Sequence, residues 1–353
     1  MDFKRAIIVN FEFNSKINQL DDVIQIKIDV PFDVKYVYTY LLKLEESYFL
    51  FDAGLNLGNW PKKFFACLEE LDITPKKISH CMVSHNHLDH IGIVKKLKRK
   101  NPDLKIMMHD ITNETMKWET NKDNFNQLKE ITEEVTKEVI QYGFSEEQGD
   151  RLTKYFLTWP QMKKYYPPDV ILYDNYEFEV ENGKFKAIWT PGHSLGHTCL
   201  FEKNRKYLFS GDHILSRITP HIGVFIINPL IKERYREYDF HNILKLYLNS
   251  LKRINELNPK IIFPAHQELI YNPEKRIKQI QEHHQKRLKE IYELIKNEPM
   301  SPVSIAKRHF GDLDDMNSFL ALSEVLSHLF YLEEQEKVEK ISKNSIIKYY
   351  ALN

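Results

Sequence analysis

The feature that most constrains this chain is the ten-residue run at residues 83–92, which places three histidines and one aspartate within six positions. Apolar residues before the run predict a short buried strand, and the residues after it predict a helix. In a loop between a strand and a helix, alternate side chains point at one place, so His85 and His87 can share a metal ion. Asp89 and His90 can then turn toward a second ion. Imidazoles and carboxylates are ligands that Zn²⁺ and similar ions prefer, so the spacing favours a metal site over a polar loop that holds three histidines by chance.

Further motifs that could supply ligands follow this run in the sequence. They are Thr-Pro-Gly-His at residues 190–193, Ser-Gly-Asp at 210–212 and Pro-Ala-His at 264–266, and an Asp-Ala-Gly at 52–54 precedes them all. With the first run, these motifs resemble the signature of the metallo-β-lactamase superfamily over roughly residues 37–268. The resemblance implies a four-layer αββα sandwich of the α/β class and a hydrolase that binds metal.

The resemblance also implies a set of seven metal ligands for two divalent ions. The first ion is assigned His85, His87 and His193, the second is assigned Asp89, His90 and His266, and Asp212 bridges both. Zinc is the first expectation for both ions, and iron or manganese are alternatives that the same ligand types accept.

Three neighbouring residues are weaker candidates. Asp52 is expected to steady the metal loop through a hydrogen bond to a ligand histidine, although it is also a common turn residue. His197 lies four residues after His193, and a structural role in the loop fits it better than ligation, because the ligand set is already full. His213 follows Asp212 and is expected to orient its neighbours or to contact substrate.

The chemistry implied by this ligand set is hydrolysis. Two adjacent ions that share Asp212 can hold a bridging water and lower its pKa toward neutrality, so that a metal-bound hydroxide is available. Asp89 can take up or relay the proton, which makes it the predicted catalytic residue. With all seven ligands present, a binding module without catalysis is disfavoured.

The substrate is less constrained than the reaction. Lys plus Arg and Asp plus Glu are both 50, so the net charge is zero and a small-molecule carboxylic ester, thioester or lactone is favoured. A phosphodiester hydrolase or nuclease is the alternative, but the basic run at 95–100 is short, and a charged run of this kind is usually a solvated helix face. The interval between Asp212 and His266 also leaves no room for the large cap domain of the nuclease branch.

A mononuclear iron dioxygenase of the same fold is a third option. A flavodiiron protein is disfavoured because His87 stands where a glutamate is expected, and a common zinc β-lactamase because Asp212 stands where a cysteine is expected.

Beyond the metal motifs, the pattern predicts two domains: residues 1–270 as the catalytic domain and 271–353 as a C-terminal domain. Within the first domain, a helix is expected over 91–100, and a polar helical insertion over about 110–170 forms either a lid over the site or a plain surface bundle. The C-terminal domain reads as three helices and a hairpin, the order of a winged helix, which this tail resembles. An apolar stripe on its third helix, over 321–332, is expected to be core or interface.

The cysteine pattern and the termini bear on the compartment. The three cysteines, Cys67, Cys81 and Cys199, are scattered and imply no disulfide framework. The apolar stretch near the N-terminus is too short for a signal peptide, and no apolar run reaches the length of a transmembrane helix. We therefore expect a cytoplasmic enzyme with no membrane contact, and a homodimer is one option for its assembly.

Overall fold

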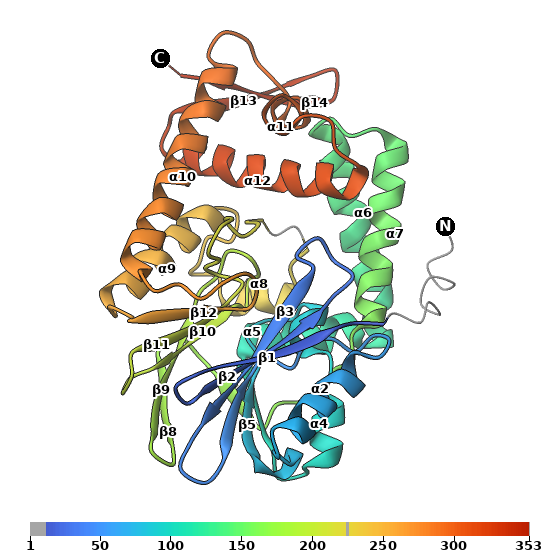
Figure 1. The fold of residues 1–353 in the computed structure, drawn as a ribbon. Helices are drawn as coiled ribbons and strands as arrows, with labels where there is room; N and C mark the ends of the chain where they lie inside the picture. Colours follow the sequence, from blue (N-terminus) through green and yellow to red (C-terminus); the bar gives the residue numbers. More distant parts are fainter. Residues whose placement is uncertain (1–11, 224–225, 353) are drawn as a thin grey trace.

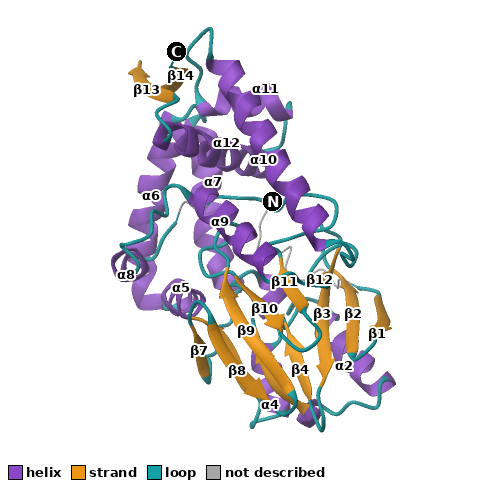
Figure 2. Cartoon of the chain, turned by 90° about the vertical axis from the view of Figure 1, so that its left-hand side faces the viewer, coloured by secondary structure: helices purple, strands orange, loops and turns teal. Residues whose placement is uncertain are grey.

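Two β-sheets packed face to face form one half of the molecule, with helices on both outer faces, and the C-terminal helices lie beyond one end of the sheets (Figure 2). The structure is a computed structural model that describes residues 12–223 and 226–352. The predicted four-layer αββα sandwich is therefore the observed arrangement.

The first sheet has seven strands in sequence order, antiparallel as far as the fourth and parallel from there on. The strands are β1 (Ser15–Leu20), β2 (Val23–Asp29), β3 (Tyr36–Lys43), β4 (Tyr48–Phe51), β5 (Ile78–Met82), β6 (Lys105–His109) and β7 (Val170–Leu172). The two edge strands, β1 and β7, were not predicted. β1 is polar and mostly exposed, and β7 has three residues, so neither gives a clear apolar alternation.

The second sheet has five strands in the order β12-β11-β10-β9-β8. They are β8 (Tyr176–Val180), β9 (Gly183–Trp189), β10 (Thr198–Glu202), β11 (Tyr207–Gly211) and β12 (Ile261–Pro264). β11 and β12 are parallel, whereas the other pairs are antiparallel, so β9, β11 and β12 all run in the same direction.

The interior between the sheets is filled largely by aromatic side chains. The ring of Tyr40 on β3 lies 5.6 Å from the rings of Phe209 and Phe263 on the opposite sheet, and Phe49 stacks on Phe185 at 4.9 Å. Burial of such large apolar surfaces is the main force that holds two sheets together. The sheets are thus fixed relative to one another, and so are the loops at their ends.

Three helices cover the outer face of the first sheet: α2 (Trp60–Glu70), α3 (Leu88–Ile91) and α4 (Val94–Lys100). The single helix predicted over 91–100 is therefore wrong in detail, because a short helix begins earlier and a break separates it from α4. Gly92 lies at the break, where an added Cβ atom would sit 2.3 Å from the backbone nitrogen of Asn56. A close approach of two backbones, which only glycine permits, thus interrupts the helix.

The insertion between β6 and β7 is helical, as predicted. It consists of α5 (Asp110–Thr120), the 3₁₀ turn η2 (Lys122–Asn124), α6 (Phe125–Gln141) and α7 (Glu146–Met162). α6 and α7 are antiparallel neighbours that rise along one side of the molecule toward the C-terminal helices (Figure 1). α8 (Pro229–Arg234) was not predicted, and it packs against α5.

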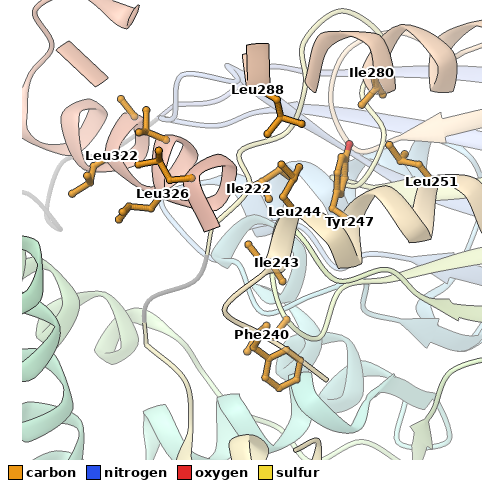
Figure 3. Close-up of a cluster of buried hydrophobic side chains, with 14 of the residues drawn as sticks. Ile222, Phe240, Ile243, Leu244, Tyr247, Leu251, Ile280, Leu288, Leu322 and Leu326 are labelled. Carbon is orange, nitrogen blue, oxygen red and sulfur yellow. The ribbon is translucent and has the colours of Figure 1, made fainter. Parts of the chain in front are cut away.

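The C-terminal segment contains the predicted three helices and hairpin: α10 (Pro273–Ile295), α11 (Pro302–Phe310), α12 (Asp315–Glu334), β13 (Val338–Lys343) and β14 (Ile346–Ala351). α12 is buried along much of its length, and the predicted apolar stripe is core. Leu322 and Leu326 of α12 belong to the same apolar cluster as Leu244 of α9 (Ile243–Glu256), which covers the second sheet (Figure 3). The assignment as a winged helix and the boundary at residue 270 stay predictions.

Among the helices of the described ranges, none combines the length and the apolar character needed to cross a membrane.

Candidate metal centre

The predicted ligands lie at the carboxyl ends of strands from both sheets. His85 and His87 follow β5, His193 follows β9, Asp212 follows β11 and His266 follows β12. Because these strands end at the same edge of the sandwich, residues up to 181 positions apart (from 85 to 266) meet in one place.

The first group is formed by His85, His87, His193 and Asp212. Nδ1 of His87 lies 2.9 Å from Nε2 of His85 and 3.0 Å from Nε2 of His193. Nε2 of His193 lies 3.3 Å from Oδ2 of Asp212. The four side-chain atoms lie within 4.8 Å of one another and could together hold one metal ion.

The second group is formed by Asp89, His90 and His266. Nε2 of His266 lies 3.6 Å from Oδ2 of Asp89, and Nε2 of His90 lies 3.8 Å from Oδ1 of Asp89. The other carboxylate oxygen of Asp212, Oδ1, lies 3.3 Å from Nε2 of His266 and 3.6 Å from Nε2 of His90. Asp212 thus presents one oxygen to each group, so its carboxylate is placed to serve both of them.

Each of four histidines has its second ring nitrogen held by another group. Nδ1 of His90 bonds to Asp52 at 2.8 Å, and Nδ1 of His85 lies 2.9 Å from the hydroxyl of Ser84. The other two contacts are to backbone carbonyls: Nδ1 of His266 to Tyr36 at 2.6 Å, and Nδ1 of His193 to His221 at 3.2 Å. Such contacts fix the ring orientation and leave Nε2 free to accept a metal.

Asp52 lies where a steadying residue was expected. It is fully buried at φ +63°, and it also accepts hydrogen bonds from the backbone and hydroxyl of Ser84 at 2.7 and 2.9 Å. The sequence did not identify three of these orienting partners: Ser84, Tyr36 and His221. Ser84 adjoins the histidine run, but the other two act through carbonyl oxygens, which every residue carries, so no side-chain signal existed.

His197 and His213 lie behind the ligands. Nε2 of His197 accepts a hydrogen bond from the backbone of Asp212 at 3.2 Å, and its Nδ1 contacts the hydroxyl of Thr190 at 2.8 Å. The ring of His213 packs 4.7 Å from that of Tyr247, and burial lowers its pKa to about 3. His197 thus joins the loops at residues 190 and 212, whereas both ring nitrogens of His213 are buried without a hydrogen-bond partner within the described residues.

The electrostatics of the two groups differ. Burial, together with the other histidines, holds the pKa of His85 and of His87 well below 6.5, so both rings stay neutral, which is the form that binds metal. Burial also acts to lower the pKa of His90 and of His266, but carboxylates, with Asp212 foremost, outweigh it and raise both values. Carboxylates therefore dominate the electrostatics of the second group, which favours a positive charge there.

Two buried atoms also indicate that a cation belongs here. Nε2 of His90 and Oδ1 of Asp212 are buried, and neither has a hydrogen-bond partner within the described residues. Leaving such atoms unpaired costs about 1–3 kcal/mol each, and metal coordination removes that cost. The residues therefore fit the divalent ions that the sequence motifs imply.

The family model described as "Metallo-beta-lactamase superfamily" matches residues 32–266, which hold every candidate ligand described above. The chain belongs to this superfamily. It is accordingly an enzyme of the metallo-β-lactamase-fold hydrolases.

Curated relatives of this superfamily member are distant. A Bacillus subtilis (strain 168) protein named "Probable metallo-hydrolase YqjP" is 23% identical over 345 residues, which is 90% of this chain and 94% of that protein. An "Atrochrysone carboxyl ACP thioesterase" from Aspergillus fumigatus is 23% identical over 274 residues. That match takes in 78% of this chain but only 62% of the thioesterase.

Solved structures share the fold over nearly the whole chain. A beta-lactamase domain protein from Burkholderia ambifaria has a TM-score of 0.77 at 21% identity and covers 96% of this chain and 94% of its own. A metallo-beta-lactamase family protein from Thermus thermophilus has a TM-score of 0.73 at 22% identity, covering 94% of this chain and 99% of its own. The shared fold therefore extends well beyond residues 32–266.

A cavity of about 440 Å³ opens onto the candidate metal ligands of this metallo-β-lactamase fold. Its floor includes His87, Asp89, His193, Asp212 and His266. Its walls come from the helical insertion, from α12, from the loop before β3 and from the loops that follow β9 and β11. Most wall residues are apolar or aromatic: Phe32, Val34, Leu128, Tyr155, Phe156, Trp159, Leu195, Ile226, Ile227, Phe319 and Leu320. The aromatic part of α7 thus lines this cavity, and the role of the insertion as a lid stays a prediction.

Proposed function

We propose that this enzyme hydrolyses a carboxylic ester, thioester or lactone whose acyl part is apolar, with a pair of divalent ions held by its two ligand groups. The first ion would be held by His85, His87 and His193, the second by Asp89, His90 and His266, and both by Asp212. Zinc is our first choice of metal. The observation that carries the proposal is the apolar cavity that leads directly to these ligands.

In this proposal the bound ions, Asp89 and the cavity walls have separate roles in hydrolysis. Bound ions of this kind supply Lewis-acid polarisation of the scissile group and a water of lowered pKa. Asp89 lies on the cavity floor with one oxygen 3.6 Å from Nε2 of His266, so its carboxylate is placed to receive a proton there. The walls hold the acyl part and exclude water from it.

The charge of the cavity supports an uncharged scissile group over a phosphodiester. Of the described residues that line it, Lys163 is the one lysine or arginine, and its Nζ is paired with Glu119 at 2.6 Å. The basic run at 95–100 lies on α4, where Lys98 is paired with Asp169 at 2.9 Å. A nucleic acid would therefore meet little free positive charge near the ligands. The name of the fungal thioesterase relative supports the same substrate class.

The test combines metal analysis with a substrate panel. The purified chain, loaded with zinc, should hydrolyse thioesters or lactones with apolar acyl groups faster than bis-p-nitrophenyl phosphate. Asp212→Ala, purified in parallel, is the control for contaminating hydrolases, because it removes an oxygen from both groups. Faster cleavage of the phosphodiester would move the enzyme to the nuclease class. One iron per chain with oxygen consumption would move it to the dioxygenases.

A further inference from the structure

His193 is connected to the C-terminal segment through His221 and Ile222, in the loop between β11 and α8. Its Nε2 faces His87 and Asp212 at 3.0 and 3.3 Å, so its Nδ1 carries the proton that is donated to the carbonyl of His221 at 3.2 Å. The position of that carbonyl therefore sets the plane of the His193 ring. His221 lies in the loop between β11 and α8, which follows Asp212.

Helix α12 holds this loop through three polar contacts. The hydroxyl of Ser323 bonds to the ring of His221, and Glu324 accepts a hydrogen bond from the backbone of Ile222 at 3.2 Å. Ser327 donates to the carbonyl of Ile222 at 3.1 Å. Ile222 itself is fully buried, and Figure 3 places it beside Leu244 of α9, with Leu326 of α12 nearby.

Glu324 is in turn fixed from α10. Its Oε1 is paired with Arg287 at 2.6 Å, while its Oε2 accepts the hydrogen bond from Ile222. Glu324 is 5% exposed, so the pair is protected from solvent. Both carboxylate oxygens are thus occupied, which limits how far the helix can move relative to the loop.

Two buried histidines extend the same network. His284, Glu324 and His328 are close enough to hold a metal ion. However, Nδ1 of His328 donates to the carbonyl of Glu324 at 2.7 Å, so its Nε2 accepts a hydrogen bond from Nδ1 of His284 at 3.1 Å. The positive charge beside Glu324 is already supplied by Arg287. The group is therefore better explained as a hydrogen-bond chain that locks α10 against α12.

We infer that α12 positions a metal ligand: Ser323, Glu324 and Ser327 hold the loop at His221 and Ile222, and the loop carbonyl orients His193. This inference rests on the metal assignment proposed above. It gives the C-terminal segment a role in metal binding, in addition to its place in the cavity wall through Phe319 and Leu320. These three residues are positioning residues, because they act on the metal group through the loop.

The test uses the full chain with Ser323→Ala and Ser327→Ala combined. Both serines are 2% exposed. Ser250 on α9 is also 2% exposed, but among the contacts described its hydroxyl bonds only within its own helix. Ser250→Ala is therefore the matched control. Zinc affinity is measured by competition with a chromophoric chelator, and the Co²⁺-loaded proteins are compared by visible absorption. Loss of a contact that orients a ligand typically weakens metal affinity about 10–100-fold. We expect the double variant to bind one of the two ions with an affinity lowered by this factor and to show a changed cobalt spectrum. The Ser250→Ala control should show neither change.

A double-mutant cycle with His193→Ala separates positioning from general loosening. If the serines act through His193, the serine substitutions should have little further effect on zinc affinity when His193 is already absent. Additive losses, or unchanged affinity and spectrum in the serine variant, would overturn the inference. If the double variant does not fold, Ser323→Ala alone provides the same comparison. If the wild-type chain binds two ions but cleaves no ester, the proposed function is refuted. The inference that α12 positions His193 is then unaffected.

Discussion

Asp52 accepts a hydrogen bond from Nδ1 of His90 at 2.8 Å, although the two residues are 38 positions apart. Replacement by asparagine keeps the shape and tolerates the left-handed backbone at this site, but it puts an amide donor where acceptors are needed. Asp52→Asn should therefore weaken binding of the second ion by about 10–100-fold. Calorimetric titration of the metal-free variant measures this directly.

The matched control for that variant is Asp169→Asn. Asp169 also accepts a backbone hydrogen bond and a side-chain hydrogen bond, from Ile106 and Lys98, but it lies at the far end of β6 from the ligands. Its substitution should lower stability without changing metal affinity. Equal affinity in both variants would show that Asp52 does not orient His90.

We expect each chain to bind two ions. Two variants should distinguish a ligand of one ion from a ligand of both. His266 belongs only to the second group, so His266→Ala should retain about one ion, whereas Asp212→Ala should weaken both sites. Elemental analysis after dialysis against a weak chelator checks the counts. A wild-type chain that saturates at one ion would contradict the bridging assignment.

Asp89 is expected to move a proton as well as to bind metal. Asp89→Asn can still offer an oxygen but cannot accept a proton, and proton transfer by a placed side chain is typically worth about 10²–10⁴ in rate. The variant, reloaded with metal, should lose most of its kcat on the best substrate with little change in KM. Steady-state kinetics on protein shown to hold both ions decides this, and near-normal kcat would leave Asp89 with a purely structural role.

Trp159 should select substrates by their acyl part. It lines the cavity and stacks on Tyr155 with ring centroids 5.4 Å apart. Loss of one such aromatic contact costs about 0.5–1.5 kcal/mol, or roughly 2–10-fold in kcat/KM. Trp159→Ala should show this loss for bulky apolar acyl groups and not for acetyl esters. Tyr271→Ala, at a side chain that is 66% exposed and does not line the cavity, serves as control, and an equal loss on both substrates would contradict the prediction.

The C-terminal histidines should make stability depend on pH. Burial lowers the pKa of His284 and of His328 from 6.5 to about 3, so the native state keeps both rings neutral while the unfolded chain takes up protons. Their stabilising contribution is complete above about pH 6.5 and falls as the pH drops toward 3, by up to about 1.4 kcal/mol per pH unit for each ring. Urea unfolding of the metal-free chain at several pH values measures the slope. His284→Gln removes one titrating ring and should give a shallower slope, whereas an unchanged slope would mean that His284 is protonated in the native state.

The sequence by itself determined which side chains are available to the candidate metal centre. The tight spacing of His85, His87, Asp89 and His90 can be read along the chain, because strand-to-loop geometry is local and the ligand types are explicit. The resemblance then supplied His193, Asp212 and His266. The apolar periodicity of α6 and α10 was also visible, since each buries one face.

Only the tertiary structure decided what surrounds these ligands. The carbonyls of Tyr36 and His221 orient His266 and His193 across 230 and 28 positions, and a carbonyl has no sequence signature. The break at Gly92 depends on a backbone that approaches from residues 54–56. The contact of α12 with the loop at Ile222 spans more than 100 positions and follows from how two apolar faces pack. Local pattern fixes which side chains are available, whereas their partners depend on long-range packing, and packing is a property of the assembled core.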